Sequence, residues 1–415
     1  MVTMRITPRW ITPALMAAVA VSTVVLAPPS AAQPDDPRVD ALLQERLVNP
    51  RIGDDVGMVV LDGATGAVVS AHDADALMLP ASNMKIITAV TVLATLGSEA
   101  QFTTRVRSGP VAGELVLEGG GDPLLTTGDL QAMARKVAKG LAPDSVVVVR
   151  VDDDLFPATG RGPGWTKGYL PYVAAPVEAL ARLGDYSPDP STNAAKVFTQ
   201  RLRALGIKAT IGEPVNVDPA APTLVERHSR VEDAVSVMLS RSENNVAEVL
   251  YRQVAVASGI EPSWDGARVA AERALGALGI DATGMALLDG SGLSRKDRLS
   301  PRFLADVLRL ARVTRPEPFV TMFEPEAMPV SGQTGTLATA YGRYVTKHAR
   351  CAQGDVHAKT GSLFDTIALS GVAETTSGGE RLFSLLVNDR PQRYSALSTR
   401  QALDGLTATI TGCWD

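Results

Sequence analysis

The spacing of apolar residues predicts a hairpin followed by a buried helix near the start of the chain. Residues 57–62 and 67–71 are short apolar runs joined by a Gly-Ala-Thr-Gly segment, which is typical of two antiparallel strands. Residues 82–96 carry apolar side chains at helical spacing and are followed by Gly97. This pattern predicts a largely buried helix with Ser82 at its N-terminus.

The middle of the chain has a different pattern of residues. From about residue 101, glycine-rich connections separate a helical pattern at 129–139, a strand-like run at 145–151 and a second helical pattern at 193–205. We interpret residues 103–228 as an inserted α/β domain.

The last part returns to the pattern of the first. Residues 231–256 are helical apart from a polar break at 241–245, and Ser300 precedes Pro301 as the cap of another helix, which runs to about Arg312. Strands are expected at the end of the chain, over 356–359, 366–373 and 380–388. They would complete the sheet that the first hairpin opens, which predicts an α/β sandwich, an antiparallel sheet with helices, interrupted by the insertion.

The N-terminus has the pattern of a secretory signal. Two arginines, an apolar run from about residue 10 to 27, Pro28-Pro29 and then Ser30-Ala31-Ala32 predict a signal peptide over 1–32. An uncleaved membrane anchor is the alternative, and peripheral membrane association also stays open. In each case the body of the protein is expected outside the cytoplasm, in the periplasm or the cell-wall space. The remaining parts would then be 33–102, the insertion 103–228 and 229–415.

The amino-acid composition excludes some classes of binding partner. The chain has 415 residues, 45% of them hydrophobic, and a net charge of −5. Without the signal it would hold 38 basic and 45 acidic residues, a balance with no electrostatic match for nucleic acid. The two cysteines, Cys351 and Cys413, are expected to form a disulfide in an oxidising compartment, with two buried thiols as the alternative. Their spacing does not indicate a metal or redox site.

The first candidate for chemistry is Ser82-Asn83-Met84-Lys85. A serine hydroxyl needs a base, and at i, i+3 on a helix Lys85 lies within reach of Ser82. Lys85 can act as that base if burial and the positive charge of Lys359 lower its pKa. The backbone N–H of Ser82 at the helix N-terminus could also stabilise an oxyanion. A capping serine beside an exposed lysine is the alternative, but Ser82 is the only serine with lysine at the third following position.

The second candidate is Ser242-Glu243-Asn244. Ser242 offers a hydroxyl for proton relay, and the Asn244 amide could orient Lys85 and the substrate. Ser191-Thr192-Asn193 has the same pattern, and a cap at a break between helices is the alternative for both strings. We set Ser191 aside because it is expected in a loop of the insertion, after Pro190.

The third candidate, Lys359-Thr360-Gly361, closes a strand-like run. Lys359 would supply positive charge, Thr360 a hydroxyl for a substrate carboxylate, and Gly361 room for the substrate to lie along the strand. The N–H of Ser362 would be a second oxyanion donor. An ordinary strand end is the alternative.

Other catalytic motifs are absent from the sequence. The four histidines form no H-E-x-x-H pattern, and no G-x-S-x-G string occurs. The glycine run at 119–121 lacks the residues of a phosphate-binding loop. We expect neither a metal nor an organic cofactor.

In this order, the three motifs resemble those of penicillin-binding proteins of the D-alanyl-D-alanine carboxypeptidase/endopeptidase type, peptidase family S13. Further strings at 119–123, 162–165, 289–294 and 335–337 are similar to that family, whereas Glu243 stands where aspartate is commoner. The second motif follows the first by 160 residues and the third follows by 117, and that large insertion distinguishes the chain from compact β-lactamases.

The resemblance implies a serine β-lactamase/transpeptidase-like fold and a stem-peptide substrate of peptidoglycan that ends in D-Ala-D-Ala. Ser82 would form an acyl-enzyme, and β-lactams would acylate the same serine. Asp152, at the end of a strand in the insertion, could face the amine of the peptide's third residue, with a solvated loop as the alternative. A β-lactamase or esterase-like hydrolase, or a non-catalytic cell-wall scaffold, remains the alternative function.

Overall fold

The computed structural model describes residues 36–158 and 160–414. The signal peptide predicted over residues 1–32 lies outside this described part. Among the described helices, none has both the length and the apolar character needed to cross a bilayer.

The first sheet joins strands from both ends of the described chain. Its order is β2-β1-β10-β9-β8, and every neighbouring pair is antiparallel. The strands are β1 (Val56–Asp62), β2 (Val68–His72), β8 (Val356–Ser362), β9 (Ile367–Glu374) and β10 (Glu380–Val387). Because β1 pairs with both β2 and β10, the predicted closure of the hairpin's sheet by the end of the chain is confirmed.

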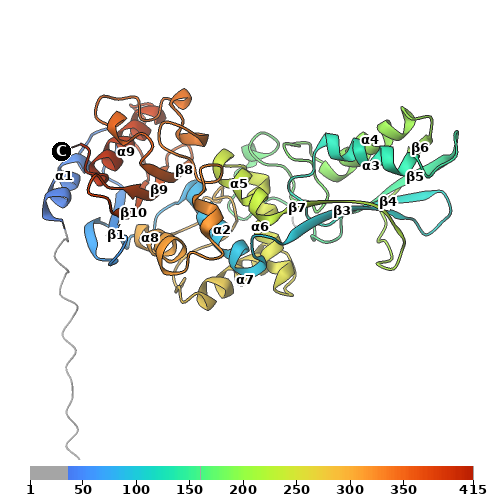
Figure 1. Cartoon of the computed structure of the whole chain (residues 1–415), viewed down its shortest axis with the longest axis horizontal. Coiled ribbons are helices and arrows are strands. Elements are labelled where there is room, and N and C mark those ends of the chain that lie inside the picture. The colour runs from blue at the N-terminus through green and yellow to red at the C-terminus, as the bar shows by residue number, and fades with distance from the viewer. Residues whose placement is uncertain (1–35, 159, 415) are drawn as a thin grey trace, which may run out of the picture. The chain divides into compact units, whose positions relative to one another are not determined.

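Helices cover both faces of this sheet, as the alternation along β1 requires. Met58 and Val60 pack with α1 (Pro37–Leu47) and α9 (Ala396–Ile410) on one face. Val59 and Leu61 face the other layer, where α8 (Pro301–Arg309) packs on the sheet and α2 (Met84–Leu96) lies beside α8. Figure 1 shows α1 and α9 beside β9 and β10, with α2 and α8 on the inner side.

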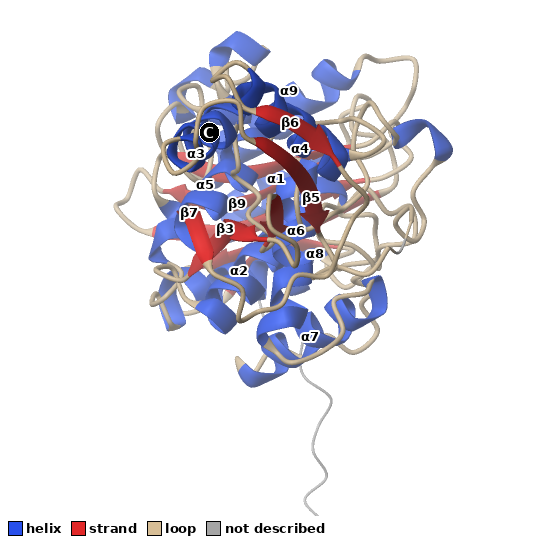
Figure 2. Ribbon diagram, turned by 90° about the vertical axis from the view of Figure 1, so that its right-hand side faces the viewer, coloured by secondary structure: helices blue, strands red, loops and turns tan. Residues whose placement is uncertain are grey.

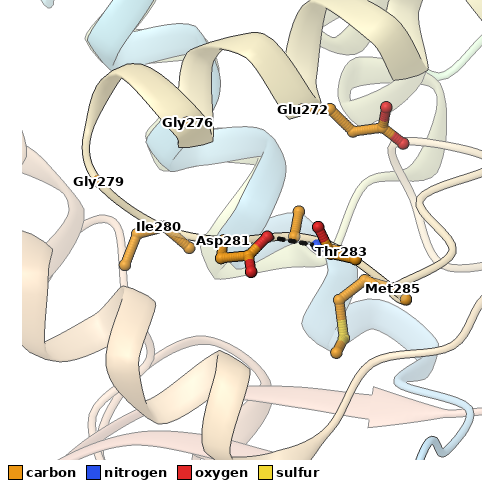
Figure 3. Close-up of a pocket in the computed structure, with 9 residues that line it drawn as sticks. Glu272, Gly276, Gly279, Ile280, Asp281, Thr283 and Met285 are labelled. Atoms are coloured by element: carbon orange, nitrogen blue, oxygen red, sulfur yellow. Dashed lines mark hydrogen bonds between the residues drawn. The ribbon is translucent and has the colours of Figure 1, made fainter. Parts of the chain in front are cut away.

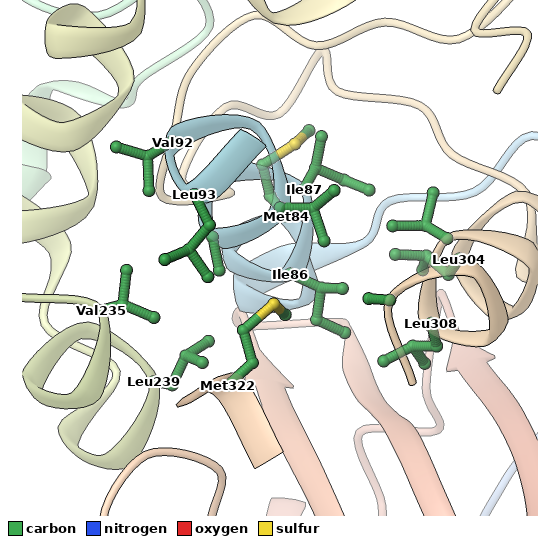
Figure 4. Packing of buried hydrophobic residues seen from close by; sticks show 14 of the residues in the cluster. Met84, Ile86, Ile87, Val92, Leu93, Val235, Leu239, Leu304, Leu308 and Met322 are labelled. Atoms are coloured by element: carbon green, nitrogen blue, oxygen red, sulfur yellow. The ribbon is translucent and has the colours of Figure 1, made fainter. Parts of the chain in front are cut away.

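Helix α2 is the buried helix that the apolar spacing predicts. Every residue from Met84 to Leu93 is buried. In Figure 4, Ile86 lies on the side of α2 that faces Leu304 and Leu308 of α8, and Leu93 lies toward Leu239 of α5 (Val231–Arg241). Burial on all sides fixes this helix, which begins at Met84, two residues after Ser82.

The second sheet contains both parallel and antiparallel pairs. Its order is β6-β5-β4-β3-β7, with β3 antiparallel to β4 and β7, and with β5 parallel to β4 and β6. The strands are β3 (Gln101–Ser108), β4 (Glu114–Gly119), β5 (Val146–Asp152), β6 (Lys208–Ile211) and β7 (Thr223–Arg230). Helices α3 (Thr127–Ala138) and α4 (Pro190–Arg203) pack against it, as Figure 2 shows next to β5 and β6.

This sheet spans residues 101–230, and the division into domains at 103 and 228 stays a prediction. One detail of the insertion differs from expectation. Helix α4 begins at Pro190, because the Asp189 side chain accepts the Thr192 N–H at 3.0 Å and proline suits the first helical position. Ser191 therefore lies in the first turn of a helix and not in a loop.

The polar break at 241–245 separates two helices, as predicted. Helix α5 ends at Arg241, Ser242 takes a left-handed conformation with φ 57°, and α6 (Asn244–Ala257) follows.

Helix α7 (Trp264–Ala277), which the sequence pattern did not indicate, packs on α6. The Ser300 cap is present, since its Oγ accepts the Phe303 N–H at 3.1 Å. The short helical turns are Ala81–Asn83, Lys167–Tyr169, Leu310–Thr314, Val320–Phe323, Gly335–Leu337, Thr339–Tyr341 and Arg350–Ala352.

Cys351 and Cys413 form a disulfide, as expected, with their Cα atoms 5.9 Å apart. The bond joins the segment before β8 to the end of the described chain after α9.

Candidate active site

Ser82 and Lys85 meet where α2 begins. Ser82 lies in the turn Ala81–Asn83, and the Lys85 Nζ is 3.1 Å from its Oγ. The same Nζ donates to Asn244 Oδ1 and to the Ser291 carbonyl, both at 2.8 Å. In the neutral form, a lysine amine with two such acceptors keeps one lone pair, which can take the proton of Ser82.

Three contacts hold the turn that carries Ser82. The Asn83 amide donates to the Lys359 carbonyl at 2.7 Å and accepts from the Ser370 hydroxyl at 2.9 Å, so it ties the turn to β8 and β9. On the other side, Gly292 lies so close that a Cβ there would come within 1.8 Å of the Ala81 carbonyl oxygen. Gly292 also has φ +79°, a conformation that favours glycine. Ser82 is thus clamped between the first sheet and the 289–294 loop.

Ser242 and Asn244 come to the same place from the break between α5 and α6. The Lys359 Nζ donates to Ser242 Oγ and to the Thr360 carbonyl, both at 2.8 Å. The Asn244 amide donates to the Val173 carbonyl at 2.9 Å while its oxygen accepts from Lys85. The left-handed backbone of Ser242 is rare for a residue with a Cβ, and such strain is often found at functional sites.

The rest of the third motif lies along β8. The Thr360 hydroxyl is 2.8 Å from that of Thr336, and the Ser362 hydroxyl donates to the Gly361 carbonyl at 2.7 Å. A Cβ at Gly361 would lie 2.9 Å from that of Ala368 and 3.0 Å from the Pro80 carbonyl oxygen. Glycine is therefore needed where β8 packs against the segment before Ser82, and the expected room for substrate along the strand stays a prediction.

These residues open into one pocket of about 300 Å³. It is lined by Ser82, Val173, Ser242, Asn244, Leu293, Thr336, Tyr341, Arg343, Thr360, Ser362 and Arg400. Lys85 and Lys359 lie beneath this lining with no exposed surface. The structure therefore brings together all the predicted site residues of the three motifs.

Burial controls the protonation of both lysines. It lowers the pKa of Lys85 to about 8, while the carboxylates of Glu248, Asp289 and Glu243 act in the opposite direction. Burial and the charge of Lys85 lower the pKa of Lys359 well below its usual value. The sequence predicts that burial and the charge of Lys359 together lower the pKa of Lys85. Burial does lower it, whereas the repulsion between the lysines acts on the pKa of Lys359.

The sequence patterns missed a buried carboxylate behind Lys85. Glu248 has no exposed surface, and its two oxygens accept the N–H groups of Gly290 and Ser291 at 3.0 and 2.9 Å. It therefore fixes the Ser291 carbonyl that accepts from Lys85. The available signal was its place in α6, one helical turn after Asn244.

Asp289 orders the same loop from within. Its carboxylate accepts the Trp165 indole N–H and the N–H groups of Gly292 and Ser294, all at 2.7 Å. Two of the strings that resemble the family, 162–165 and 289–294, thus contact each other. They shape the loop that supports Ser82 and Lys85.

Asp152 is not part of this pocket. It ends β5, and its carboxylate accepts the Val217 N–H at 2.8 Å and the Asp154 N–H at 3.3 Å. A role for Asp152 in binding the substrate amine stays a prediction.

A larger pocket, of about 550 Å³, lies elsewhere and has no nucleophile paired with a base (Figure 3). Its lining includes Glu272, whose carboxylate accepts from Arg268 at 2.7 Å, and Asp281, which accepts the Thr283 N–H at 2.9 Å. These carboxylates already have local partners, so the smaller pocket at Ser82 is the candidate active site.

Comparison with known proteins agrees with this geometry. The model of the D-Ala-D-Ala carboxypeptidase 3 (S13) family matches residues 39–186 and 167–410. Carboxypeptidase DacB of Mycolicibacterium smegmatis is 31% identical over 405 residues, which cover 89% of this chain and 83% of that protein. D-alanyl-D-alanine carboxypeptidase of Actinomadura sp. is 26% identical over 452 residues, which cover 84% and 80%.

A solved structure shares the fold. Penicillin binding protein 4 of Haemophilus influenzae aligns with a TM-score of 0.75 at 20% identity, over 89% of this chain and 98% of that one. This likeness confirms the predicted α/β fold of the penicillin-binding type. The family match along nearly the whole described chain and the 31% identical relative show that the protein belongs to the D-Ala-D-Ala carboxypeptidase (S13) family.

Proposed function

We propose that the protein is a serine D-Ala-D-Ala carboxypeptidase and endopeptidase that acts on peptidoglycan stem peptides through an acyl-serine. The observation that carries this proposal is the pair of contacts at one pocket, Lys85 with Ser82 at 3.1 Å and Lys359 with Ser242 at 2.8 Å. The relatives named D-alanyl-D-alanine carboxypeptidase support the substrate class.

In the proposed acylation, neutral Lys85 takes the proton of Ser82, whose Oγ attacks the carbonyl carbon of the penultimate D-Ala. The N–H groups of Ser82 and Ser362 hold the oxyanion. Ser242, whose hydroxyl Lys359 holds, relays the proton that Lys85 has taken to the amide nitrogen as the C–N bond breaks, so the terminal residue leaves as an amine and Lys85 is neutral again. The 2.8 Å contact between Lys359 and Ser242 supports this relay.

Water then completes the reaction. It attacks the acyl carbon, Lys85 accepts a proton from the water, and the bond to Ser82 Oγ breaks. The shortened peptide leaves with a free carboxylate, and Ser82 regains its proton.

We also propose that β-lactams acylate Ser82, because their strained amide and carboxylate resemble the terminal dipeptide. Proteins of the same fold support the idea. Penicillin binding protein 4 of Haemophilus influenzae has been solved in complex with a β-lactam, and an endopeptidase of Bdellovibrio bacteriovorus has been solved acylated by penicillin G.

Export to the periplasm or cell-wall space completes the proposal. Two observations support export: residues 1–32 have the pattern of a signal peptide, and the proposed substrate, peptidoglycan, lies outside the cytoplasm. The alternative is membrane association through an uncleaved N-terminus. The intact mass of the exported protein would show whether residues 1–32 have been removed.

Intact mass against time after mixing with penicillin tests the function. We expect a long-lived adduct of one drug mass that is absent from Ser82→Ala, together with release of D-Ala from a stem peptide by the wild type alone. D-Ala release by the variant would contradict the assignment of Ser82. A brief adduct with hydrolysed drug would indicate a β-lactamase, and no adduct would indicate a non-catalytic scaffold.

A further inference from the structure

Two arginines line the pocket, and only one of them is neutralised. Arg343 is almost fully buried, and its guanidinium donates to both oxygens of the fully buried Asp404 at 2.5 to 3.1 Å. The Asp404 carboxylate also accepts the Tyr344 N–H at 3.0 Å. The charge of Arg343 is therefore already paired inside the protein.

Arg400 has a different environment. It lies on α9, and its Nη2 donates to the Ser362 hydroxyl at 3.1 Å. Within the described part of the chain, Arg400 forms no ion pair with a carboxylate. Burial and the positive charges of Arg343 and Arg390 lower its pKa, and only Asp404 acts in the other direction. Arg400 is thus a partly buried cation at the edge of the pocket that has no ion-pair partner within the described residues.

The position of Arg400 in the pocket suits the binding of a carboxylate group of a ligand. Arg400 reaches the residue that follows Gly361 on β8, and the pair of hydroxyls of Thr336 and Thr360 faces the same pocket. A guanidinium with further free N–H donors beside two hydroxyls is a typical environment for a carboxylate, which it can bind through two parallel hydrogen bonds. A substrate that extends along β8 past Ser82 would place its leaving group at this end.

We propose that Arg400 binds the carboxylate of the leaving residue and makes the pocket selective for substrates that carry it. This inference rests on the proposed function, since it assigns a role in substrate recognition at the same site. Both a terminal D-Ala and penicillin carry such a carboxylate. The side chain of the stem peptide's diamino acid is a second source of carboxylate, which penicillin lacks.

The test compares acylation of the full protein by benzylpenicillin and by its methyl ester, which differ only in the charge of this carboxylate. We expect wild type to prefer the acid, and Arg400→Ala to lose about ten- to a hundredfold of that preference, the usual effect of losing a hydrogen bond to a charged group. Arg400→Lys should recover part of it. The ratio of the two rates does not depend on how much of a variant is folded.

Arg393→Ala is the matched control, because Arg393 is exposed and stacks on Tyr394 outside the pocket. It should keep the wild-type ratio. An equal loss of rate toward acid and ester, or an unchanged ratio, in Arg400→Ala would overturn the inference while leaving the function intact. A preference lost only with a stem peptide, and kept with penicillin, would also overturn it and assign Arg400 to the diamino acid. Absence of any wild-type adduct would overturn the proposed function itself.

Discussion

At the scale of single residues, the site depends on keeping two lysines buried close together. Burial lowers the pKa of Lys85 while the nearby carboxylates raise it, so its proton is held by opposing influences. Two of the carboxylates that set this balance, Glu248 and Asp289, are not in the catalytic motifs. The balance can be tested through the pH dependence of the reaction and through Glu248.

The rate of acylation should follow the deprotonation of Lys85. Burial places its pKa at about 8, and only the neutral amine can accept the Ser82 proton. The rate should therefore rise with pH through about 8 and level off above it. At pH 6, about one Lys85 in a hundred is neutral, so acylation should be roughly a hundredfold slower than on the plateau. Intact mass against time, from pH 5.5 to 9.5, measures this, and a flat profile would exclude Lys85 as the base.

Glu248→Gln should slow acylation and move its pH midpoint. Burial raises the pKa of Glu248 to about 8, so Glu248 and Lys85 change charge over the same pH range. The ionised carboxylate raises the pKa of Lys85, and removing it should shift the midpoint to lower pH. Glutamine has one acceptor oxygen where two N–H groups need one each, so the Ser291 carbonyl should lose its position and the plateau rate should fall about tenfold. Glu272→Gln on α7 is the control. A slower variant with an unmoved midpoint would mean that Glu248 acts only on the fold.

At the scale of elements, the decisive contact is that between the 289–294 loop and the turn before α2. Gly292→Ala would add a Cβ within 1.8 Å of the Ala81 carbonyl oxygen, in a backbone conformation with φ +79°. The turn must move, and a shift of about 1 Å in a reacting group can cost about a hundredfold in rate. We expect acylation to fall by at least this factor while circular dichroism keeps its native form.

Gly284 offers a matched control for this change. It has φ +83°, but a Cβ at this position would have no atom within 4 Å. Gly284→Ala therefore has the same backbone cost, about 1 kcal/mol, without the contact. Equal activity of the two variants would show that the loop does not position Ser82.

The elements that the sequence predicts well are those whose signal is local. The apolar spacing of α2 and the cap at Ser300 need no distant partner, and both are found in the structure. Strand β7 was missed because most of its side chains are at least partly exposed, which leaves no apolar alternation to detect. Arg400 was missed for another reason. It stands in no motif and reaches the pocket only because α9 packs on the sheet that contains β8.

At the scale of the whole described chain, the pocket is built from segments far apart in sequence. Ser82, Ser242 and Thr360 come from three elements, while Val173 comes from the part that we interpret as an insertion. The three motifs identify these segments in advance because each has a fixed residue pattern. The loops that complete the pocket have no such pattern, and the packing of the whole unit decides their position.

The disulfide is the covalent link at this scale. Cys351 and Cys413 are separated by 62 residues, a segment that includes β8, β9 and β10. Closing a loop of this length restricts the unfolded chain, so replacing both cysteines by serine should lower the free energy of unfolding by about 2–4 kcal/mol. Urea denaturation of the double variant, of reduced wild type and of oxidised wild type measures this loss of unfolding free energy. Because the sulfur atoms are not among the groups that line the pocket, acylation by penicillin below the transition should stay within about twofold of wild type. An unchanged midpoint would mean that the packing of α9 on the sheet, rather than the covalent link, holds the end of the chain.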